Sequence, residues 1–279
     1  MAFLWNGKFK EKDETDMRKE KQPGKLRGLG ESFIIAFSMY SRIPMPMVEW
    51  SERGMKYALC FFPAVGVVTG MLVTLFWHLA AILKLGIFSR TLIGTALPIL
   101  ITGGIHMDGF LDTVDARSSH QTRERTLEIL KDPHAGAFAI AGCGVYLLFY
   151  AAVFSELGDG AFPALAGIFV VSRALSGFSV VTFPKAKKDG LVTTFSNGAK
   201  ESSKAVQAVL LLWLAAGFLW IFFAGGGKMA VGTGIAAVIV FLWYRHMALK
   251  EFGGITGDLA GYFLQLAELF MVGAAGILL

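Results

Sequence analysis

The chain has 279 residues, of which 54% are hydrophobic and 17% are charged, and its mean hydropathy is +0.57. Soluble domains carry about 25% charged residues, so this composition excludes an ordinary soluble protein and indicates one that crosses a lipid bilayer. The net charge of +5 comes mostly from segments that flank apolar runs, where it suits anionic lipid, and we expect no nucleic-acid partner. Cys60 and Cys143 lie within apolar runs and predict neither a disulfide framework nor a thiolate metal site.

Residues 1–56 form a charged N-terminal segment without the pattern of a signal peptide. Its stretch from Glu31 to Trp50 is too short, and too interrupted by Arg42 and two prolines, to cross a bilayer. We expect an interfacial or re-entrant helix there. Arg42 is a candidate ligand for a substrate phosphate, and the alternative is that it snorkels to lipid head groups.

Residues 57–279 are expected to form one domain, an all-α bundle of about seven transmembrane helices. A helix crosses a hydrocarbon core of about 30 Å with roughly 20 apolar residues, and it satisfies its own backbone hydrogen bonds there. Seven runs meet this requirement: 57–83, 87–105, 136–155, 161–183, 205–224, 229–244 and 259–279.

With these spans, 22 of the 26 Lys and Arg residues fall on one side of the membrane. The positive-inside rule assigns that side, together with the N-terminus, to the cytoplasm, and the protein to the cytoplasmic (inner) membrane. Four polar segments share this side: HMDGFLDTVD, LEILKD, KKDGLVTTF and GGITGD. We therefore expect them to converge on one site that faces the cytoplasm.

The segment that follows the second span carries three aspartates with helical spacing. Asp108, Asp112 and Asp115 stand at i, i+4 and i+7, so their carboxylates project from one helix face. Their repulsion is relieved either by full solvation or by a divalent cation between them. Oxygen ligands favour Mg²⁺, which takes one or two carboxylates together with substrate phosphates. The spacing thus predicts a magnesium site, with a solvated helix end as the alternative.

Two neighbours of the aspartates are further candidates. His106 could orient a carboxylate or act as a base, although a lone histidine at a membrane boundary is at least as often structural. Lys131, beside Asp132, could clamp a phosphate, although, taken alone, a solvated amphipathic helix is the better explanation. Pro133 is expected to end that helix.

These motifs resemble the cobalamin synthases, the adenosylcobinamide-GDP ribazoletransferases. The likeness starts at SRIPMP and FFPAVG, is strongest in GGIHMDGFLDTVD and LEILKD, continues through KKDGLVTTF and ends with GGITGDLAGYFLQLAEL. It implies a magnesium-dependent membrane enzyme that joins adenosylcobinamide-GDP to α-ribazole or its 5′-phosphate and releases GMP. A homo-oligomer, or an association with other cobalamin-assembly enzymes, is left open.

The resemblance also implies roles for individual residues. Asp108, Asp112 and Asp115 would hold the metal, with Lys131 and Asp132 beside the phosphates. Two further walls of the substrate site would come from Asp189 and from the set Thr256, Gly257 and Asp258. Glycines in GGITGD either let backbone amides approach an anion or simply break the helix before the last span.

Arg173 and Glu268 lie within apolar runs, where charged side chains normally face the interior of the bundle. Asp258, Gln265 and Glu268 share one side of the last helix and suggest a polar seam. This seam either accommodates part of the corrinoid substrate or contains an Arg173–Glu268 ion pair.

Two other classes of membrane protein fit the sequence less well. A cation transporter is disfavoured because the carboxylates lie beyond an apolar run and the chain shows no pair of similar halves. A CDP-alcohol phosphotransferase also uses aspartates and magnesium, but its later pair of aspartates, four residues apart, is missing here.

Overall fold

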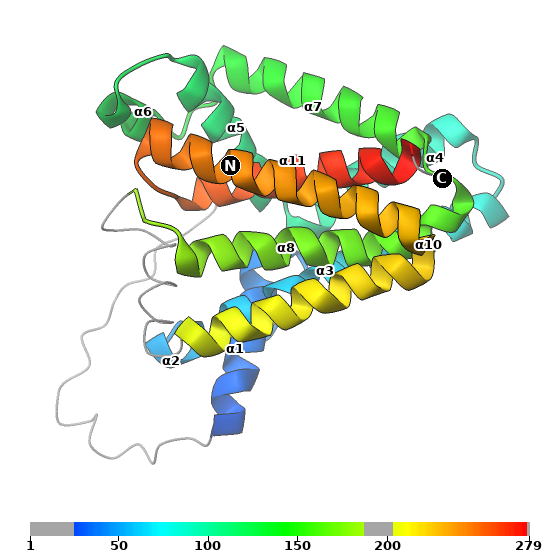
Figure 1. The fold of residues 1–279 in the computed structure, drawn as a ribbon, viewed down its shortest axis with the longest axis horizontal. Helices are drawn as coiled ribbons and strands as arrows, with labels where there is room; N and C mark the ends of the chain where they lie inside the picture. Colours follow the sequence, from blue (N-terminus) through cyan, green and yellow to red (C-terminus); the bar gives the residue numbers. More distant parts are fainter. Residues whose placement is uncertain (1–24, 187–202, 278–279) are drawn as a thin grey trace.

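The computed structural model describes residues 25–186 and 203–277. Within these ranges the chain is helical, with a single parallel bridge between Lys185 and Ile255 and no strand, so the expected all-α fold is confirmed. The helices, shown in Figure 1, are α1 Lys25–Tyr40, α2 Glu52–Met55, α3 Ala58–Ile82, α4 Ile87–Thr102, α5 Ile105–Ser118, α6 Arg123–Ile129, α7 Ala137–Ser155, η1 Asp159–Ala164, α8 Leu165–Thr182, α10 Ser203–Met247, η3 Ala248–Phe252 and α11 Gly257–Ile277.

Five described helices are long and apolar enough to cross a membrane: α3, α7, η1 with α8, α10 with η3, and α11. α4 and α5 pass the same test only as a pair, which is bent by 97°. Because α5 has 14 residues and carries three aspartates, we treat α4 as the spanning part and α5 as lying outside it. The number of crossings and the side of the N-terminus stay predictions.

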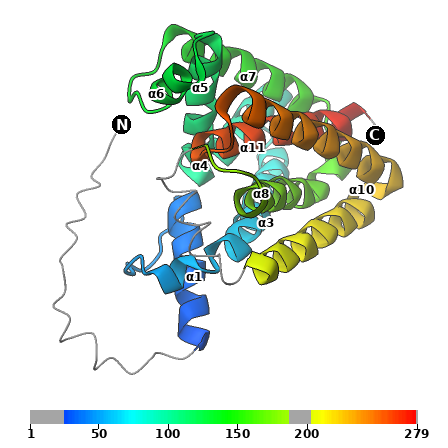
Figure 2. The same ribbon diagram turned by 60° about the vertical axis from the view of Figure 1, so that its left-hand side comes forward.

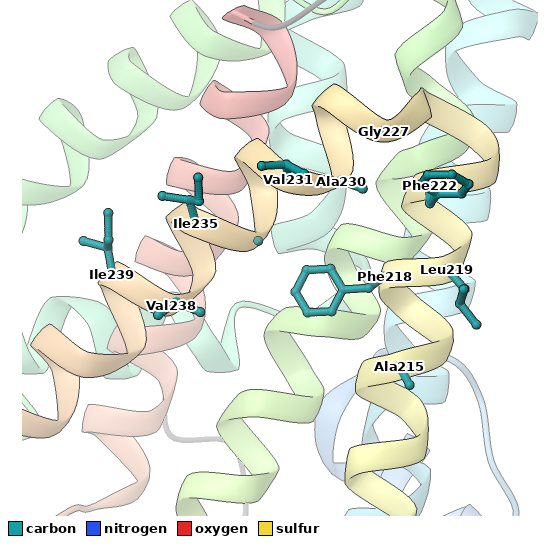
Figure 3. A pocket seen from close by; sticks show the side chains of 11 residues that line it. Ala215, Phe218, Leu219, Phe222, Gly227, Ala230, Val231, Ile235, Val238 and Ile239 are labelled. Carbon is teal, nitrogen blue, oxygen red and sulfur yellow. The ribbon is translucent and has the colours of Figure 1, made fainter.

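The two apolar runs 205–224 and 229–244 lie within the single element α10, which contains a break at Gly226 (φ 82°, ψ 172°). Figure 1 shows that α10 turns back on itself, and the close-up in Figure 3 shows side chains of its two arms on either side of the turn. An apolar pocket of about 750 Å³ lies between the arms, and no candidate site residue lines it. The separation of these two runs is therefore produced by one left-handed glycine.

α8 is the central helix of the bundle, with 83% of its apolar window buried. It packs closely on α3, because a Cβ placed on Gly70 would stand 2.3 Å from the Cα of Ala166. Small residues at such a crossing let two backbones touch, which is how helices associate in a bilayer. Arg173, one of the two buried charges, is thereby enclosed at the centre of the bundle.

The segment 1–56 contains the helix α1, and its expected interfacial or re-entrant position stays a prediction. α1 begins at Lys25 and ends at Tyr40, and residues 41–51 are not helical. Pro44 and Pro46 explain the end, since a proline removes a backbone donor and clashes with the preceding turn. α1 packs on α3, with the ring centroids of Tyr40 and Phe62 4.1 Å apart (Figure 2). It does not qualify as a span.

The sharp turn between α4 and α5 positions the acidic helix. Gly103 (φ 67°) and Gly104 (φ 80°) are both left-handed, a conformation that costs other residues about 1–2 kcal/mol. Figures 1 and 2 show α5 and α6 at one end of the molecule, beside the first turns of α7 and α11. The aspartates therefore lie where several spanning helices begin.

Candidate active site

Four carboxylates come together on α5 and the first turn of α11. Burial, followed by the charges of Asp108, Asp258 and Asp115, raises the pKa of Asp112 to about 7. Asp258 is 146 residues further along the chain than Asp112, so the expected meeting of the HMDGFLDTVD and GGITGD segments is confirmed. Such a concentration of like charge favours binding of a cation.

Close packing of α5 on α11 creates this arrangement. A Cβ on Gly109 would lie 2.7 Å from the carbonyl oxygen of Asp258, and one on Gly261 would lie 3.0 Å from that of His106. Any larger side chain at Gly109 would therefore push the two helices apart. Glycine at this crossing holds the backbone of Asp258 against the acidic helix.

Asp115 has a partner that its neighbours lack. Its carboxylate accepts hydrogen bonds from the backbone N–H groups of Gly136 (2.5 Å) and Ala139 (2.8 Å), at the start of α7. Asp115 thus caps a helix that begins 22 residues later, and its charge suits the positive end of that helix. Asp108 and Asp112 accept no hydrogen bond from the described residues and remain open to a ligand.

The open carboxylates of Asp108 and Asp112 fit a magnesium ion whose other ligands come from water and from the substrate. No group of three His, Cys, Asp or Glu side chains in the described parts of the chain could hold a metal ion by itself. Magnesium does not need such a cage, because it typically binds one or two carboxylates and takes its remaining ligands from water and substrate phosphates. The acidic face therefore fits a cation that arrives with, or is completed by, a diphosphate.

The GGITGD segment forms the wall opposite α5. The hydroxyl of Thr256 accepts a hydrogen bond from the N–H of Leu259 (3.2 Å) and lies 3.3 Å from Asp258 Oδ2, so Thr256 caps α11. Gly257 is exposed beside it. The close approach of Gly254 to Lys185, where a Cβ would meet the carbonyl carbon at 2.5 Å, favours the structural explanation of that glycine.

The last residues described before the KKDG segment, 184–186, pair with this wall. Ala186 donates its N–H to the carbonyl of Ile255 (3.0 Å), and Ile255 donates to that of Pro184 (2.8 Å). Asp189 itself lies outside the described residues, so its assignment to the site stays a prediction.

Lys131 and Asp132 lie on an exposed turn between α6 and α7. Asp132 accepts hydrogen bonds from the backbone N–H (3.0 Å) and Nδ1 (2.8 Å) of His134, and these bonds lower the pKa of its carboxyl group. Four residues after Asp132 the chain reaches Gly136 and the carboxylate of Asp115. The turn therefore borders the acidic face, although neither side chain contacts the aspartates.

Arg42 lies at the other end of α5. Its N–H donates to the carbonyl of Ile101 (2.7 Å), and its side chain covers the turn into α5, where a Cβ on Gly103 would stand 2.9 Å from its Nε. This position suits contact with a phosphate bound near Asp108, and the lipid alternative stays open.

His106 faces away from the carboxylates. It is 5% exposed, stacks on Tyr40 with ring centroids 5.9 Å apart, and lies 5.6 Å from the ring of Phe62. Since residues two apart on a helix point to nearly opposite sides, His106 cannot share the face of Asp108. Its position supports the structural explanation rather than a role as base.

Arg173 and Glu268 form the ion pair that was one of the two explanations for the polar seam. Nη1 of Arg173 lies 2.5 Å from Oε1 of Glu268, and the two side chains are 1% and 2% exposed. Ser172 also donates to Glu268 (3.0 Å), and Tyr146 of α7 donates to Gln265. The seam thus joins α7, α8 and α11 inside the bundle, and its buried charges Arg173 and Glu268 are not open to a substrate, whereas Asp258 lies at its partly exposed end.

Sequence reasoning missed Arg117, in the last turn of α5. Its Nε and Nη2 donate to the two carboxylate oxygens of Glu251 (2.7 and 3.0 Å), and Nη1 donates to the hydroxyl of Tyr262 (3.0 Å). Burial alone would lower the pKa of Arg117, but the hydrogen bond and charge of Glu251 raise it. The sequence did contain a signal for this pair: Arg117 ends the acidic helix, and Glu251 lies in another loop that was assigned to the same side of the membrane.

Comparison with known proteins gives one consistent result. A model of the cobalamin-5-phosphate synthase family matches residues 32–276. A protein of Lachnoclostridium phytofermentans named adenosylcobinamide-GDP ribazoletransferase is 47% identical over 88% of this chain and 93% of its own length. Proteins with the same name from Clostridium botulinum and Treponema denticola are each 32% identical, over 88% and 86% of this chain and 96% and 95% of their own lengths. No solved structure matches the chain.

Proposed function

The chain belongs to the cobalamin-5-phosphate synthase family, and from this premise we propose that the acidic face of α5 is its catalytic centre. The protein is an adenosylcobinamide-GDP ribazoletransferase, a membrane enzyme of cobalamin biosynthesis. It joins adenosylcobinamide-GDP to α-ribazole, or to α-ribazole 5′-phosphate, and releases GMP. Neither the CDP-alcohol phosphotransferase nor the cation transporter is supported.

The reaction exchanges one phosphorus–oxygen bond for another. A free ribose hydroxyl of the ribazole substrate, not the 5′ oxygen that carries the phosphate in α-ribazole 5′-phosphate, attacks the phosphorus on the corrinoid side of the diphosphate and loses its proton to water, while the bond from that phosphorus to the bridging oxygen breaks. The bridging oxygen leaves with the electron pair as part of GMP. Catalysis of such a transfer consists mainly of holding the two substrates in line and stabilising charge on the phosphate oxygens.

We assign different tasks to the aspartates. Asp108 and Asp112 would hold Mg²⁺ together with substrate phosphate oxygens, with the negative charge of Asp258 beside them, and the ion would neutralise charge on the diphosphate. Asp115 is a positioning residue, because its hydrogen bonds to Gly136 and Ala139 fix α5 against α7. Arg42, over the turn into α5, is placed to contact a phosphate oxygen at the N-terminal edge of the acidic face.

One observation carries this proposal: Asp108, Asp112, Asp115 and Asp258 lie together on α5 and the first turn of α11, and this crowding, added to burial, raises the pKa of Asp112. Without a counter-ion, such crowding costs free energy, so a cluster of this kind indicates a site whose charge is used. No other group of described residues combines open carboxylates with a position at the meeting point of the predicted segments.

A direct assay tests the proposal. Purified protein would be incubated with Mg²⁺, adenosylcobinamide-GDP and α-ribazole, and GMP and the joined corrinoid would be quantified. We expect Asp112→Asn to lower kcat by at least about 10³-fold, since it removes charge from the phosphate site. Glu156→Gln, an exposed carboxylate at the far end of α7, is the matched control and should keep full activity. Normal turnover by Asp112→Asn would contradict the assignment.

We also propose that this site faces the cytoplasm, on the strength of the distribution of Lys and Arg. Ala135 is exposed in the turn before α7 and borders the acidic face. A cysteine at this position should react with a membrane-impermeant maleimide in inverted vesicles and not in intact cells. The opposite labelling pattern would reverse the orientation. Self-association and association with other cobalamin-assembly enzymes stay predictions.

A further inference from the structure

A polar pocket of about 560 Å³ lies beside the acidic face, where the end of α5 meets α6 and η3. None of the residues predicted from the sequence lines it. It shares α5 with the aspartates: Ala116, in its wall, follows Asp112 by four residues and so lies about one turn further along the same side of the helix, whereas Arg117 reaches the pocket from a different side of α5. A molecule bound in this pocket is therefore within reach of a diphosphate held at the aspartates.

Arg117 presents a fixed guanidinium group to the pocket. Three of its five N–H groups donate to Glu251 and Tyr262. The guanidinium carbon Cζ lies 5.3 Å from the centre of the Trp243 ring. The other two N–H groups have no acceptor among the described residues. A planar guanidinium held in one orientation is well suited to phosphate, because little conformational entropy is lost on binding.

The remaining charges of the pocket are arranged asymmetrically. Arg123 donates to the carbonyl of Lys250 (3.4 Å) and lies over Gly253, where a Cβ would stand 2.9 Å from its Nη1. It therefore brings positive charge to the GGITGD wall. Glu124, on the first turn of α6, is exposed and has no partner among the residues described. The pocket thus contains three cations, Arg117, Arg123 and Lys250, and two carboxylates, of which Glu251 pairs with Arg117 and Glu124 is open.

Resting on the function proposed above, we infer that this pocket binds the guanosine 5′-phosphate part of adenosylcobinamide-GDP, which leaves as GMP. Arg117 and Arg123 bind the phosphate of that part. Glu124 accepts hydrogen bonds from guanine, whose N1–H and 2-amino group are adjacent donors that match two carboxylate oxygens. Adenine lacks this pair of donors, so the same carboxylate selects guanine.

The apolar groove on the other side of Arg117 does not suit a nucleotide. This groove, about 940 Å³ in volume, lies between α7, the second arm of α10 and α11, and reaches Trp243 and Tyr262 beneath Arg117. Its lining is almost entirely apolar, and a phosphate or a guanine edge buried there would lose its hydrogen bonds. The nucleotide is thus assigned to the polar side.

Equilibrium binding of GMP to the full-length protein in lipid nanodiscs tests the inference without turnover. Wild-type protein should bind GMP at least about tenfold more tightly than IMP, which lacks the 2-amino group. Arg117→Ala should weaken GMP binding at least about tenfold, which corresponds to one lost charged contact. Arg125→Ala removes an exposed cation of α6 outside the pocket and should bind GMP like wild type.

Arg117→Ala leaves Glu251 without its partner and can therefore harm folding. Glu124→Gln avoids this problem, because Glu124 is exposed and supports no other residue. We expect this variant to keep the thermal stability of the wild type and to bring its affinities for GMP and IMP within about threefold of each other.

The outcomes separate this inference from the proposed function. Unchanged GMP affinity in Arg117→Ala and unchanged preference for GMP over IMP in Glu124→Gln, with wild-type turnover intact, would overturn the inference and leave the function standing. Loss of discrimination in Glu124→Gln would support it. Normal turnover by Asp112→Asn would instead contradict the assigned catalytic centre, whatever the GMP affinities.

Discussion

Removing either partner of the buried Arg173–Glu268 pair should destabilise the bundle far more than removing both. Glu268→Leu leaves the Arg173 cation with the carbonyl of Phe169 (3.0 Å) and the hydroxyl of Ser172 (3.3 Å) as its hydrogen-bond partners. An uncompensated buried charge costs about 3–5 kcal/mol. Arg173→Leu should lie at the lower end of this range, because a protonated Glu268 can keep its bond from Ser172. The double variant should lie within about 1–2 kcal/mol of wild type, since apolar replacements of buried pairs are often neutral.

Reversible unfolding in mixed micelles would give the free energies for a double-mutant cycle. The structure predicts a coupling energy of at least about 2 kcal/mol between the two positions. Exchanging the charges, with Arg173→Glu and Glu268→Arg together, should recover only part of the lost stability. The carbonyl of Phe169 and the hydroxyl of Ser172, which accept hydrogen bonds from Arg173, would not be placed to accept them from an arginine at position 268. Additive single effects, or a single variant within about 1 kcal/mol of wild type, would refute the pairing as a stabilising contact.

Three further predictions concern the acidic helix. Asp115→Asn should lower the free energy of unfolding by about 1 kcal/mol, because it weakens the cap on α7. Asp112→Asn relieves repulsion between carboxylates and should keep or raise the unfolding temperature. Thermal melts of the two variants would therefore distinguish the structural role of Asp115 from the role of Asp112. Gly109→Ala should cost about 1–3 kcal/mol by pushing α5 away from Asp258, measured against Gly144→Ala, which meets nothing within 4 Å. Gly103→Ala and Gly104→Ala should each lower the free energy of unfolding by about 1–2 kcal/mol, because both positions have a positive φ. Only Gly103→Ala also displaces the side chain of Arg42. A raised KM for adenosylcobinamide-GDP in Gly103→Ala alone would therefore support contact between Arg42 and the phosphate.

Apolar length and helical spacing were sufficient to predict much of the bundle. The runs at 57–83 and 136–155 correspond closely to α3 and α7, because about 20 apolar residues leave a chain in a bilayer few alternatives to a helix. The aspartates lie on one helix as their spacing indicates. The pairing of Arg173 with Glu268 could be anticipated because isolated charges in apolar runs need partners.

The remaining features depend on contacts between distant residues, which local patterns do not encode. The 97° bend before α5 rests on two left-handed glycines, yet glycine in a sequence does not state which conformation it will adopt. In the sequence, Asp115 looks equivalent to Asp108 and Asp112 as a metal ligand. Only the folded structure shows that its carboxylate accepts hydrogen bonds from the start of α7. Arg117 and Glu251 are 134 residues apart, and only the packing of α5 near η3 brings them together.

The attachment of α5 also determines how a bulky substrate can enter. Asp115 is tied to α7, Gly109 is pressed against α11, and Arg117 is held by Glu251, so this helix is secured along its length. Entry of a corrinoid is therefore not expected to displace α5, because such a movement would break contacts with three other elements. The non-helical stretch 41–51 meets the start of the same helix at Arg42, whose N–H donates to the carbonyl of Ile101.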